Sequence, residues 1–293
     1  MRRSMLFIPG NSPAMLLNAD IHQADAVILD LEDAVSPSEK DAARILVRNA
    51  ISALKFKGTE IIVRVNPLDS GYTRADLENM VPLNPSLIMP TKVSGADDIR
   101  SIAAMMTQIE GANGQEPGAV GLMPLLETAE GVLNAYAIAK ADKRVKALFL
   151  GAEDLTSDLQ AIRSKSSQEI FYARGQIVMA ARAAGVDVYD TPFTDVNDDD
   201  GMAEDAQFAR ALGFTGKSAI SPRHVSIINE VFSPSLKDID YAREVMAVIE
   251  EAKRLGKGAI SLHGKMVDKP IVDRARRVLE AARALGLGGA KHE

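Results

Sequence analysis

Short apolar runs alternate with helix-patterned segments along most of the 293-residue chain. Continuous apolar runs of this length are typical of parallel strands that are buried on both faces. The starts of neighbouring runs lie between 21 and 39 residues apart, which leaves room for a helix in every gap. The eight runs are Met5–Pro9, Ala26–Leu31, Glu60–Val65, Leu87–Met89, Val120–Leu126, Ala147–Leu150, Val186–Tyr189 and Gly216–Ile220. The pattern therefore predicts eight strand–helix units.

Two folds are built from such units, an open doubly wound sheet and a closed barrel. The turn after the first run, PGNSPA, lacks the G-x-G-x-x-G sequence of a dinucleotide-binding doubly wound sheet. Eight repeats also match the number of strands that closes a barrel. We therefore predict an α/β fold, a (β/α)8 TIM barrel.

The segments between the runs carry helix signals of their own. Ser38 is expected to cap a helix with an acidic first turn, whose apolar face would be Ala42, Ile45, Leu46 and Ile51. The acidic run at 197–200, Asn-Asp-Asp-Asp, is interpreted as the cap and first turn of another helix rather than as a metal site.

The barrel pattern ends near residue 233, which predicts a catalytic barrel domain of residues 1–233 and a C-terminal helical segment of residues 234–293. A helix over 238–255 and another from about Pro270 are expected in this segment. In the first of them, apolar residues at a 4-3-4-3 spacing form one stripe, Tyr241, Val245, Val248, Ala252 and Leu255. Such a stripe must cover another surface, so the segment is expected to be a lid on its own barrel or on a neighbouring subunit.

Composition narrows the function. The net charge of −6 and the absence of a basic stripe argue against a nucleic-acid partner. The chain has no cysteine, which excludes disulfides, thiolate nucleophiles and Cys-ligated metals. The apolar run at the N-terminus breaks at Pro9-Gly10, too early for a signal segment or a spanning helix, and no other run approaches membrane length. We expect a cytoplasmic protein with no membrane association.

Arg64 is the first candidate site residue, because it lies in the buried third strand. Alternation places Ile61, Val63 and Val65 on one face and Ile62, Arg64 and Asn66 on the other. A buried cation needs an anionic partner, and a guanidinium suits a carboxylate in bidentate geometry. We predict that Arg64 binds a substrate carboxylate; the alternative is an ion pair with Asp30 or Glu32 alone.

The second strand ends in the acidic sequence Asp30-Leu31-Glu32-Asp33. Asp30 and Glu32 share one side of the pleat. Together with Asp33, they are expected to hold Arg64 or to orient metal-bound waters rather than to bind the metal directly. A nearby cation would offset their mutual repulsion.

Glu127 and Asp154 follow the fifth and sixth strands, where barrel enzymes carry their chemistry. One carboxylate from each of two adjacent strands, completed by water and substrate oxygens, is a usual way to hold Mg²⁺. The four histidines show no zinc-ligand spacing. The alternative is helix capping, which Thr128 and Thr156 can supply instead. The sequence thus predicts a magnesium site at Glu127 and Asp154, with Mn²⁺ as an alternative ion.

Two further segments offer weaker candidates. The backbone N–H groups of Gly151, Ala152 and Glu153 can face an oxyanion of the substrate. In the C-terminal segment, Asp268 follows His263 and Lys265 and is a candidate acid or base that a closing lid delivers. For Asp268, the alternative is an ordinary exposed loop charge.

The strand-end motifs, taken in order, resemble those of the citrate lyase β subunit family, within the wider group of CitE-like and malyl-CoA lyase (HpcH/HpaI aldolase) barrels. The resemblance spans residues 2–280 and rests on RRSMLFIPGN, ADAVILDLEDAV, IIVRVNP, PLLET, LGAEDL, FYAR, YDTPFTDVND, GFTGKSAISPRH and GKMVDKPIVDRAR. One departure is MPTKV, where Thr91 stands between the proline and Lys92, so a role for Lys92 is left open.

The resemblance implies roles for four residues. The substrate-carboxylate arginine of the family falls on Arg64, and its two metal ligands fall on Glu127 and Asp154. The family fold is a barrel whose C-terminal lid typically reaches a neighbouring subunit. The lid aspartate that acts as general acid or base in related lyases falls on Asp268.

The implied activity is cleavage of a citryl-thioester to oxaloacetate and an acetyl-thioester, with the thioester on CoA or on a CoA-like prosthetic group. The implied partners are the acyl carrier (γ) and transferase (α) subunits of citrate lyase, with a homo-oligomer, a trimer or a hexamer, formed by the chain itself. The alternatives are a stand-alone lyase of malyl-, citramalyl- or 3-hydroxy-3-methylglutaryl-type thioesters, a malate-synthase-like or thioesterase enzyme, and a catalytically silent subunit.

Overall fold

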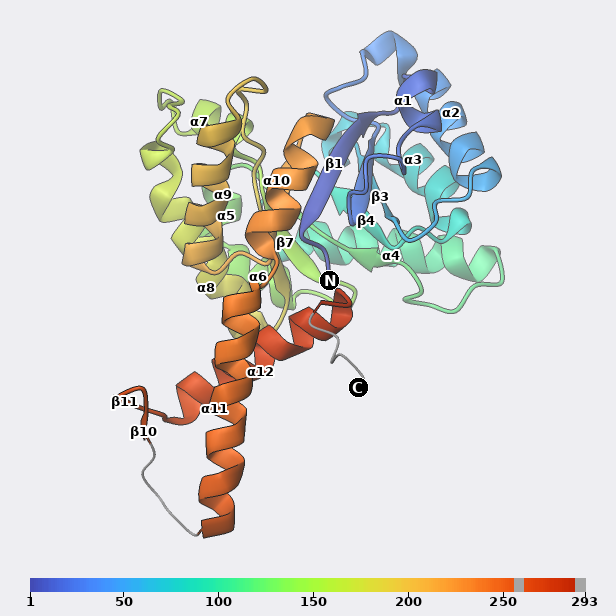
Figure 1. Cartoon of the computed structure of the whole chain (residues 1–293). Helices are drawn as coiled ribbons and strands as arrows, with labels where there is room; N and C mark the ends of the chain where they lie inside the picture. The colour runs from blue at the N-terminus through green and yellow to red at the C-terminus, as the bar shows by residue number, and fades with distance from the viewer. Residues whose placement is uncertain (256–260, 288–293) are drawn as a thin grey trace. The chain divides into compact units, whose positions relative to one another are not determined.

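The computed structural model describes residues 1–255 and 261–287, and the chain divides into two compact units between Phe232 and Ser233. The first unit, Arg2–Phe232, is a parallel sheet surrounded by helices (Figure 1). The second unit begins at Ser233 and is helical, with a short hairpin between its helices.

Nine parallel strands form the sheet of the first unit, and they correspond to the eight expected runs with the fifth run divided in two. Their spatial order is β5-β4-β3-β2-β1-β9-β8-β7-β6. The strands are β1 Ser4–Pro9, β2 Ala26–Asp30, β3 Glu60–Val65, β4 Leu87–Pro90, β5 Gly121–Leu122, β6 Leu125–Leu126, β7 Ala147–Leu150, β8 Asp187–Asp190 and β9 Gly216–Ala219.

The sheet closes through the divided fifth run. β5 pairs with β4, β6 pairs with β7, and Met123 and Pro124 separate the two short strands. The Met123 N–H donates to the Ile88 carbonyl, and the Pro124 carbonyl accepts from the Phe149 N–H. Proline has no N–H for the ladder, which explains the break without loss of contact to either neighbour. The predicted (β/α)8 barrel is confirmed.

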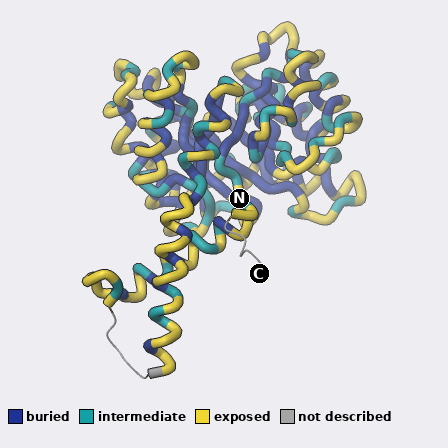
Figure 2. The backbone as a smooth tube through the Cα atoms, in the orientation of Figure 1, coloured by how far each residue is buried: buried dark blue, intermediate teal, exposed yellow. Residues whose placement is uncertain are grey.

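Helices cover the outside of this barrel, and Figure 2 shows the strands buried while the outer faces of the helices are exposed. The helices are α1 Pro13–Leu17, α2 Lys40–Ala53, α3 Thr73–Met80, α4 Ala96–Ala112, α5 Ala129–Leu133, α6 Ala135–Lys140, α7 Ala152–Asp158, α8 Phe171–Ala184, α9 Asp199–Leu212 and α10 Pro222–Phe232. Four single 3-10 turns add to them, at Pro37–Glu39, Leu68–Ser70, Val81–Leu83 and Gln168–Ile170.

Strand alternation divides the buried side chains into two layers. One apolar cluster, which includes Leu29 and Val63, packs between the strands and the helices. A smaller cluster, which includes Ile28 and Ile62, fills the inside of the barrel. Arg64 has the parity of Ile62, and Asp30 has the parity of Ile28. Strand alternation therefore points the side chains of Asp30, in β2, and Arg64, in β3, into the barrel near its carboxyl end.

The start and the buried face of α2 differ from the prediction. The helix begins at Lys40 after the 3-10 turn, and Ser38 makes no cap bond to the backbone. The buried face is Ala43, Arg44, Val47 and Ala50, whereas Ala42 and Ile45 are exposed. The prediction placed the buried face on the wrong side of the helix. A charged residue is usually exposed, but Arg44 is buried in an ion pair with Asp76.

The acidic run before α9 acts as the sequence predicted. Asp198 is the N-cap, and its carboxylate accepts from the Gly201 N–H at 2.9 Å. Asp199 and Asp200 occupy the first turn, where negative charge complements the helix dipole. The interpretation of this run as a helix start rather than a metal site is supported by these contacts.

The second unit consists of α11 Leu236–Leu255, a hairpin of β10 Ser261–Leu262 and β11 Lys265–Met266, and α12 Lys269–Ala284. Its apolar cluster is Ala242, Val245, Val267, Val272 and Ala275. The predicted stripe of α11 was rotated: Val245 and Ala252 are buried, but Tyr241 is exposed and Ala242 takes its place. Ala242 packs in one cluster with Val272 and Ala275 of α12. The side chain of Leu255 lies outside the described residues.

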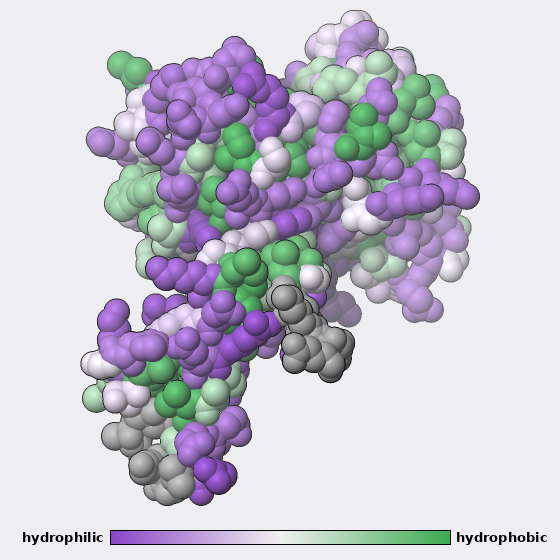
Figure 3. All heavy atoms as spheres, viewed as in Figure 1, coloured by the Kyte–Doolittle hydropathy of each residue, from purple (hydrophilic) through white to green (hydrophobic). Residues whose placement is uncertain are grey.

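In the part of the chain that the structure describes, we find no helix with the length and apolarity to span a membrane. Figure 3 shows hydrophilic residues over much of the barrel face turned to the viewer, with apolar residues between them. Such a mixed surface is usual for helices whose outer faces meet water.

Candidate active site

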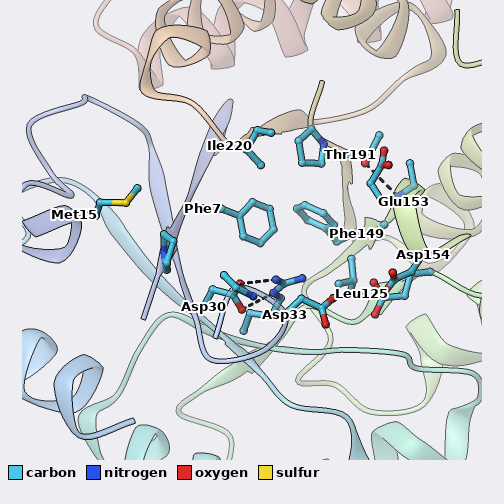
Figure 4. Close-up of a pocket in the computed structure, with 17 residues that line it drawn as sticks. Phe7, Met15, Asp30, Asp33, Leu125, Phe149, Glu153, Asp154, Thr191 and Ile220 are labelled. Atoms are coloured by element: carbon cyan, nitrogen blue, oxygen red, sulfur yellow. Dashed lines mark hydrogen bonds and ion pairs between the residues drawn. The ribbon is translucent and has the colours of Figure 1, made fainter. Parts of the chain in front are cut away.

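The carboxyl ends of the strands surround a cavity of about 290 Å³, which brings together most of the predicted site residues. Arg64, Asp30, Asp33, Glu127 and the segment Gly151–Asp154 all line it. The rest of the lining is mostly apolar: Phe7, Pro9, Met15, Ala34, Leu125, Phe149, Thr191, Pro192 and Ile220. Figure 4 shows the Phe7 and Phe149 rings in the middle of the cavity, near the charged groups.

Arg64 is held by two acids of the second strand. Its guanidinium donates to both carboxylate oxygens of Asp30, with Nε 2.7 Å from Oδ1, and its Nη1 lies 3.2 Å from Oε2 of Glu32. The guanidinium also lies 5.1 Å from the centre of the Phe7 ring. Burial lowers the pKa of Arg64, but the hydrogen bonds and charge of Asp30 outweigh burial and raise that pKa above its ordinary value. Arg64 therefore stays a cation in the cavity wall.

The ion pairs do not use up Arg64. A guanidinium has five N–H donors, and the contacts with Asp30 and Glu32 use three of them. Two donors are left for a substrate carboxylate, so both the expected ion pair and a substrate contact fit the same side chain. Asp30 in turn is fixed by the N–H groups of Glu32 and Ala34.

Glu127 follows β6 and is 3% exposed. Its Oε1 accepts from the Lys92 N–H at 2.8 Å, which fixes the plane of the carboxyl group. Burial, with the charge of Asp154 as the next cause, raises the pKa of Glu127 to about 8. An acid this costly to ionise without a partner is suited to a cation that neutralises it.

Asp154 is the third residue of α7, which follows β7 with only Gly151 between them. Its Oδ2 is buried and has no hydrogen-bond donor, and the nearest cation that the structure records is the Lys92 ammonium at 3.9 Å. No group of three or more His, Cys, Asp or Glu side chains with metal-binding geometry occurs within residues 1–255 and 261–287. Two carboxylates with an unsatisfied oxygen fit a magnesium site, since Mg²⁺ keeps several waters.

Metal binding at this pair should depend strongly on pH. Glu127 must lose its proton to bind a metal, so we expect the apparent affinity for Mg²⁺ to weaken about tenfold per pH unit below pH 8. The stability of the metal-free protein depends on pH with the opposite sign: the protonated Glu127 contributes its full stability to the fold below about pH 4.5, and that contribution is lost as pH rises through about 8. Titration calorimetry at two pH values measures the first effect; a pH-independent affinity would contradict it.

Lys92, whose role the sequence left open, lies among the acids. Its backbone is left-handed, with φ 53°, and such strain in a non-glycine residue occurs often at functional sites. Its Nζ lies 3.3 Å from Oε1 of Glu32, and its N–H holds Glu127. Thr91, the residue that departs from the family motif, is buried and donates to the Val65 carbonyl. The insertion therefore does not remove the lysine from the site.

The segment Gly151–Glu153 contributes differently from what the sequence suggested. The Gly151 N–H donates to the Leu126 carbonyl and the Ala152 N–H to the Thr191 hydroxyl, so these two amides are engaged within the protein. Gly151 provides space instead: a Cβ there would lie 2.8 Å from Cβ and 2.9 Å from Oε2 of Glu127. Glu153 pairs with Arg163 at 2.9 Å. All three residues still border the cavity and remain candidate substrate contacts.

Asp33 borders the cavity too, and its N–H donates to Oε2 of Glu32 at 2.9 Å. The pKa of Glu32 is raised, mainly by burial, with the charge of Asp33 adding to it and Arg64 opposing it. The second strand thus supplies Asp30 and Glu32 as holders of Arg64, as expected, and Asp33 as a nearby charge.

Asp268, the predicted lid residue, belongs to the C-terminal unit. It is the N-cap of α12, and its carboxylate accepts from the Ile271 N–H at 3.2 Å. The side chain is exposed. This contact is a structural role for Asp268 in its own helix, and its catalytic role stays a prediction.

A buried charged cluster next to the cavity was not anticipated. Arg174 and Lys217 pair with Asp190 and Asp205 at distances of 2.5 to 3.0 Å, and the first three are fully buried. Lys217 also donates to the carbonyl of Thr191, a cavity residue. A lysine inside the apolar run Gly216–Ile220 and an aspartate at the end of β8 are the sequence features from which it could have been inferred. The cluster fixes the strand ends that form this side of the cavity.

Comparison with known proteins identifies the family and agrees with the barrel fold. Residues 3–222 match the model of the HpcH/HpaI aldolase/citrate lyase family. The chain is 43% identical over 284 residues to the citrate lyase subunit beta of Leuconostoc mesenteroides subsp. cremoris, covering 97% of this chain and 94% of that protein. It is 32% identical over 295 residues to the mitochondrial citramalyl-CoA lyase of Rattus norvegicus, covering 97% and 87%.

Solved structures of related proteins have a similar fold. The CitE protein of Mycobacterium tuberculosis, in complex with magnesium, acetoacetate and coenzyme A, superimposes with a TM-score of 0.79 at 30% identity, covering 96% of this chain and 98% of that one. A citrate lyase beta subunit from M. tuberculosis, complexed with oxaloacetate and magnesium, gives a TM-score of 0.68 at 28% identity, covering 80% and 97%.

Proposed function

The chain belongs to the HpcH/HpaI aldolase/citrate lyase family, and we propose that it cleaves a citryl-thioester to oxaloacetate and an acetyl-thioester, as a citrate lyase β subunit. It is a carbon–carbon lyase with Mg²⁺ as its cofactor. The observation that carries the proposal is the pair Glu127 and Asp154, which lines one cavity with the charged Arg64. The higher identity to citrate lyase β subunits than to citramalyl-CoA lyase favours the citryl substrate.

Glu127 and Asp154 are the residues that would hold the metal. When bound, Mg²⁺ supplies Lewis acidity toward the hydroxyl and carboxylate oxygens of the substrate. Arg64 offers its two remaining donors to a substrate carboxylate and so fixes the orientation of the carbon–carbon bond that breaks. Phe7 and Phe149, packed edge to face with centroids 6.0 Å apart, give the cavity an apolar wall that would limit water around that bond.

The cleavage itself transfers one electron pair and one proton. A base takes the proton of the hydroxyl, the hydroxyl oxygen becomes the ketone oxygen of oxaloacetate, and the electron pair of the bond to the acetyl-thioester carbon stays with that carbon. That carbon leaves as an enolate and must be protonated. We propose Asp268 as the acid for this step, supported by its place in the GKMVD motif of the C-terminal unit.

The partners follow from the same assignment. We propose that the thioester is carried on a CoA-like arm of an acyl carrier (γ) subunit, that a transferase (α) subunit supplies it, and that the chain forms a homo-oligomer. Exposed apolar side chains on α5, α6 and α8 support an oligomer, namely Leu133, Tyr136, Phe171, Tyr172 and Met179. The cytoplasmic location stays a prediction.

A substrate panel tests the proposed function. We expect Mg²⁺-dependent cleavage of citryl-CoA with release of oxaloacetate, slower cleavage of malyl- and citramalyl-CoA, and loss of every activity in EDTA that returns with Mg²⁺ or Mn²⁺. A coupled assay for oxaloacetate and a separate assay for free CoA distinguish cleavage from thioester hydrolysis. A preference for citramalyl-CoA, or release of free CoA alone, would replace the proposal with a stand-alone lyase or a thioesterase.

A further inference from the structure

Lys92 stands between two acids that differ in their other partners. Glu32 has Arg64 at 3.2 Å in addition to Lys92 at 3.3 Å, so it keeps a cationic partner, shared with Asp30, when the lysine moves. Asp154 has Lys92 at 3.9 Å as the nearest cation that the structure records, and its Oδ2 accepts no hydrogen bond. The side chain of Lys92 is 43% exposed and is not part of the cavity lining. The ammonium therefore lies between Glu32 and Asp154 and is partly accessible to solvent.

The backbone of Lys92 is fixed where its side chain is not. The Lys92 N–H holds Oε1 of Glu127 at 2.8 Å, and the adjoining Thr91 hydroxyl is tied to the Val65 carbonyl. The left-handed conformation at φ 53° is the geometry that lets this amide reach Glu127 while the side chain turns toward Glu32 and Asp154. A substitution that alters only the side chain keeps the backbone N–H that makes this contact.

From this geometry we propose that Lys92 determines substrate specificity as a movable cation. Resting on the proposed function, Lys92 neutralises Asp154 while no metal is bound, yields Asp154 to the metal ion, and then binds the second carboxylate of the substrate. Mg²⁺ and Lys92 compete for Asp154 because both are cations within reach of the same oxygen. Glu32 keeps its ion pair with Arg64 throughout, a partner that it shares with Asp30.

The candidate substrates differ in their number of free carboxylates, and an extra carboxylate is a group that the released Lys92 ammonium can bind. A citryl-thioester has two free carboxylates, whereas malyl- and citramalyl-thioesters have one. The carboxylate next to the hydroxyl is met by the metal site and by the two free donors of Arg64. A second carboxylate needs a second cation, and Lys92 is the cation that metal binding releases. Lys92 therefore favours substrates that yield a dicarboxylic 2-oxo acid over those that yield a monocarboxylic one.

Two variants of Lys92 and two measurements test this inference. Lys92→Met keeps the length of the side chain and removes the charge, and Lys92→Arg keeps the charge. Without substrate, we expect Lys92→Met to bind Mn²⁺ roughly tenfold more tightly than the wild type, as follows from removing one positive charge a few ångström from a divalent ion. Lys92→Arg should bind Mn²⁺ as the wild type does. Electron paramagnetic resonance of free Mn²⁺ measures both.

The second measurement is the ratio of kcat/KM for citryl-CoA to that for malyl-CoA. We expect Lys92→Met to lower this ratio at least about tenfold, mainly through KM for citryl-CoA, and Lys92→Arg to preserve most of it. An equal loss with both substrates, or an unchanged ratio, overturns the inference even if Mn²⁺ binding tightens. Unchanged or weaker Mn²⁺ binding overturns it as well.

The variant Lys92→Gly and the activity of the wild type serve as further controls for this test. Lys92→Gly preserves the left-handed backbone and the amide that holds Glu127, so it replaces Lys92→Met if that protein is poorly folded. If the wild type cleaves no thioester, the proposed function fails by itself. The Mn²⁺ measurement then still decides whether Lys92 competes with a metal ion for Asp154.

Discussion

Replacing Glu127 with glutamine is expected to lower kcat/KM for thioester cleavage by roughly 10³-fold while the barrel stays folded. Loss of a metal ligand removes several kcal/mol of Lewis-acid stabilisation of the transition state, which corresponds to about this factor. Glutamine keeps the shape of the side chain and an oxygen for the Lys92 N–H. It also removes a buried carboxyl whose pKa is raised to about 8, so the free energy of unfolding of the metal-free protein should not fall.

Steady-state kinetics at saturating Mg²⁺ and circular dichroism on the same samples check this result. Glu130→Gln is the matched control, because Glu130 is an exposed acid on α5, three residues further along the chain. The control should retain the activity of the wild type. Near-normal kcat/KM in Glu127→Gln at saturating Mg²⁺ would exclude Glu127 as a metal ligand and would undo the site assignment.

Replacing Arg64 with methionine is expected to cost about 3–5 kcal/mol of unfolding free energy as well as the activity. The guanidinium is the main partner of Asp30, whose side chain is 2% exposed, and removing one member of a buried ion pair leaves the other charge uncompensated. For a unit of this size, the loss corresponds to a fall in Tm of roughly 6 to 20 °C. Activity should fall with it, because the cavity loses its substrate cation.

A second substitution separates the two effects. In the double variant Arg64→Met/Asp30→Asn, the orphaned acid is neutralised, so much of the lost Tm should return while thioester cleavage stays low. Arg48→Met is the control, since Arg48 is exposed and its recorded contact is a 3.3 Å hydrogen bond to Asn79. Its Tm should change little. Recovery of activity in the double variant would show that Arg64 only balances Asp30 and does not bind substrate.

Local sequence patterns determined the fold class because each pattern reports one physical requirement. Strands buried on both faces must be apolar throughout, so the eight runs identified the barrel strands within a few residues. Alternation likewise placed Arg64 and Asp30 on the same side of neighbouring strands, and the pairing of Asp30 with Arg64 across β2 and β3 follows from it. Because Glu127 and Asp154 follow neighbouring parallel strands, the sequence also predicted that both acids lie at the carboxyl end of the barrel.

Tertiary contacts decided what no local pattern contains. Whether Arg44 is buried depends on Asp76, 32 residues away, so the face of α2 was assigned incorrectly. Lys92 reaches Glu32, Glu127 and Asp154 from three other strand ends, and the spacing of those residues in the chain gives no distance between them. A side chain at Gly151 would collide with Glu127, and this close approach can be seen only in the folded structure.

The sequence by itself therefore determined the barrel, the acid pair Glu127 and Asp154, and the inward-facing Arg64. These depend on strand periodicity and on the common edge that parallel strands share. Only the tertiary structure shows the contacts of these residues. Arg64 pairs with Asp30 and Glu32, and Glu127 accepts a hydrogen bond from the Lys92 amide. One buried oxygen of Asp154 has no hydrogen-bond partner. Ion pairs and burial are set by distances across the closed ring, and closure brings together side chains that the chain order keeps apart.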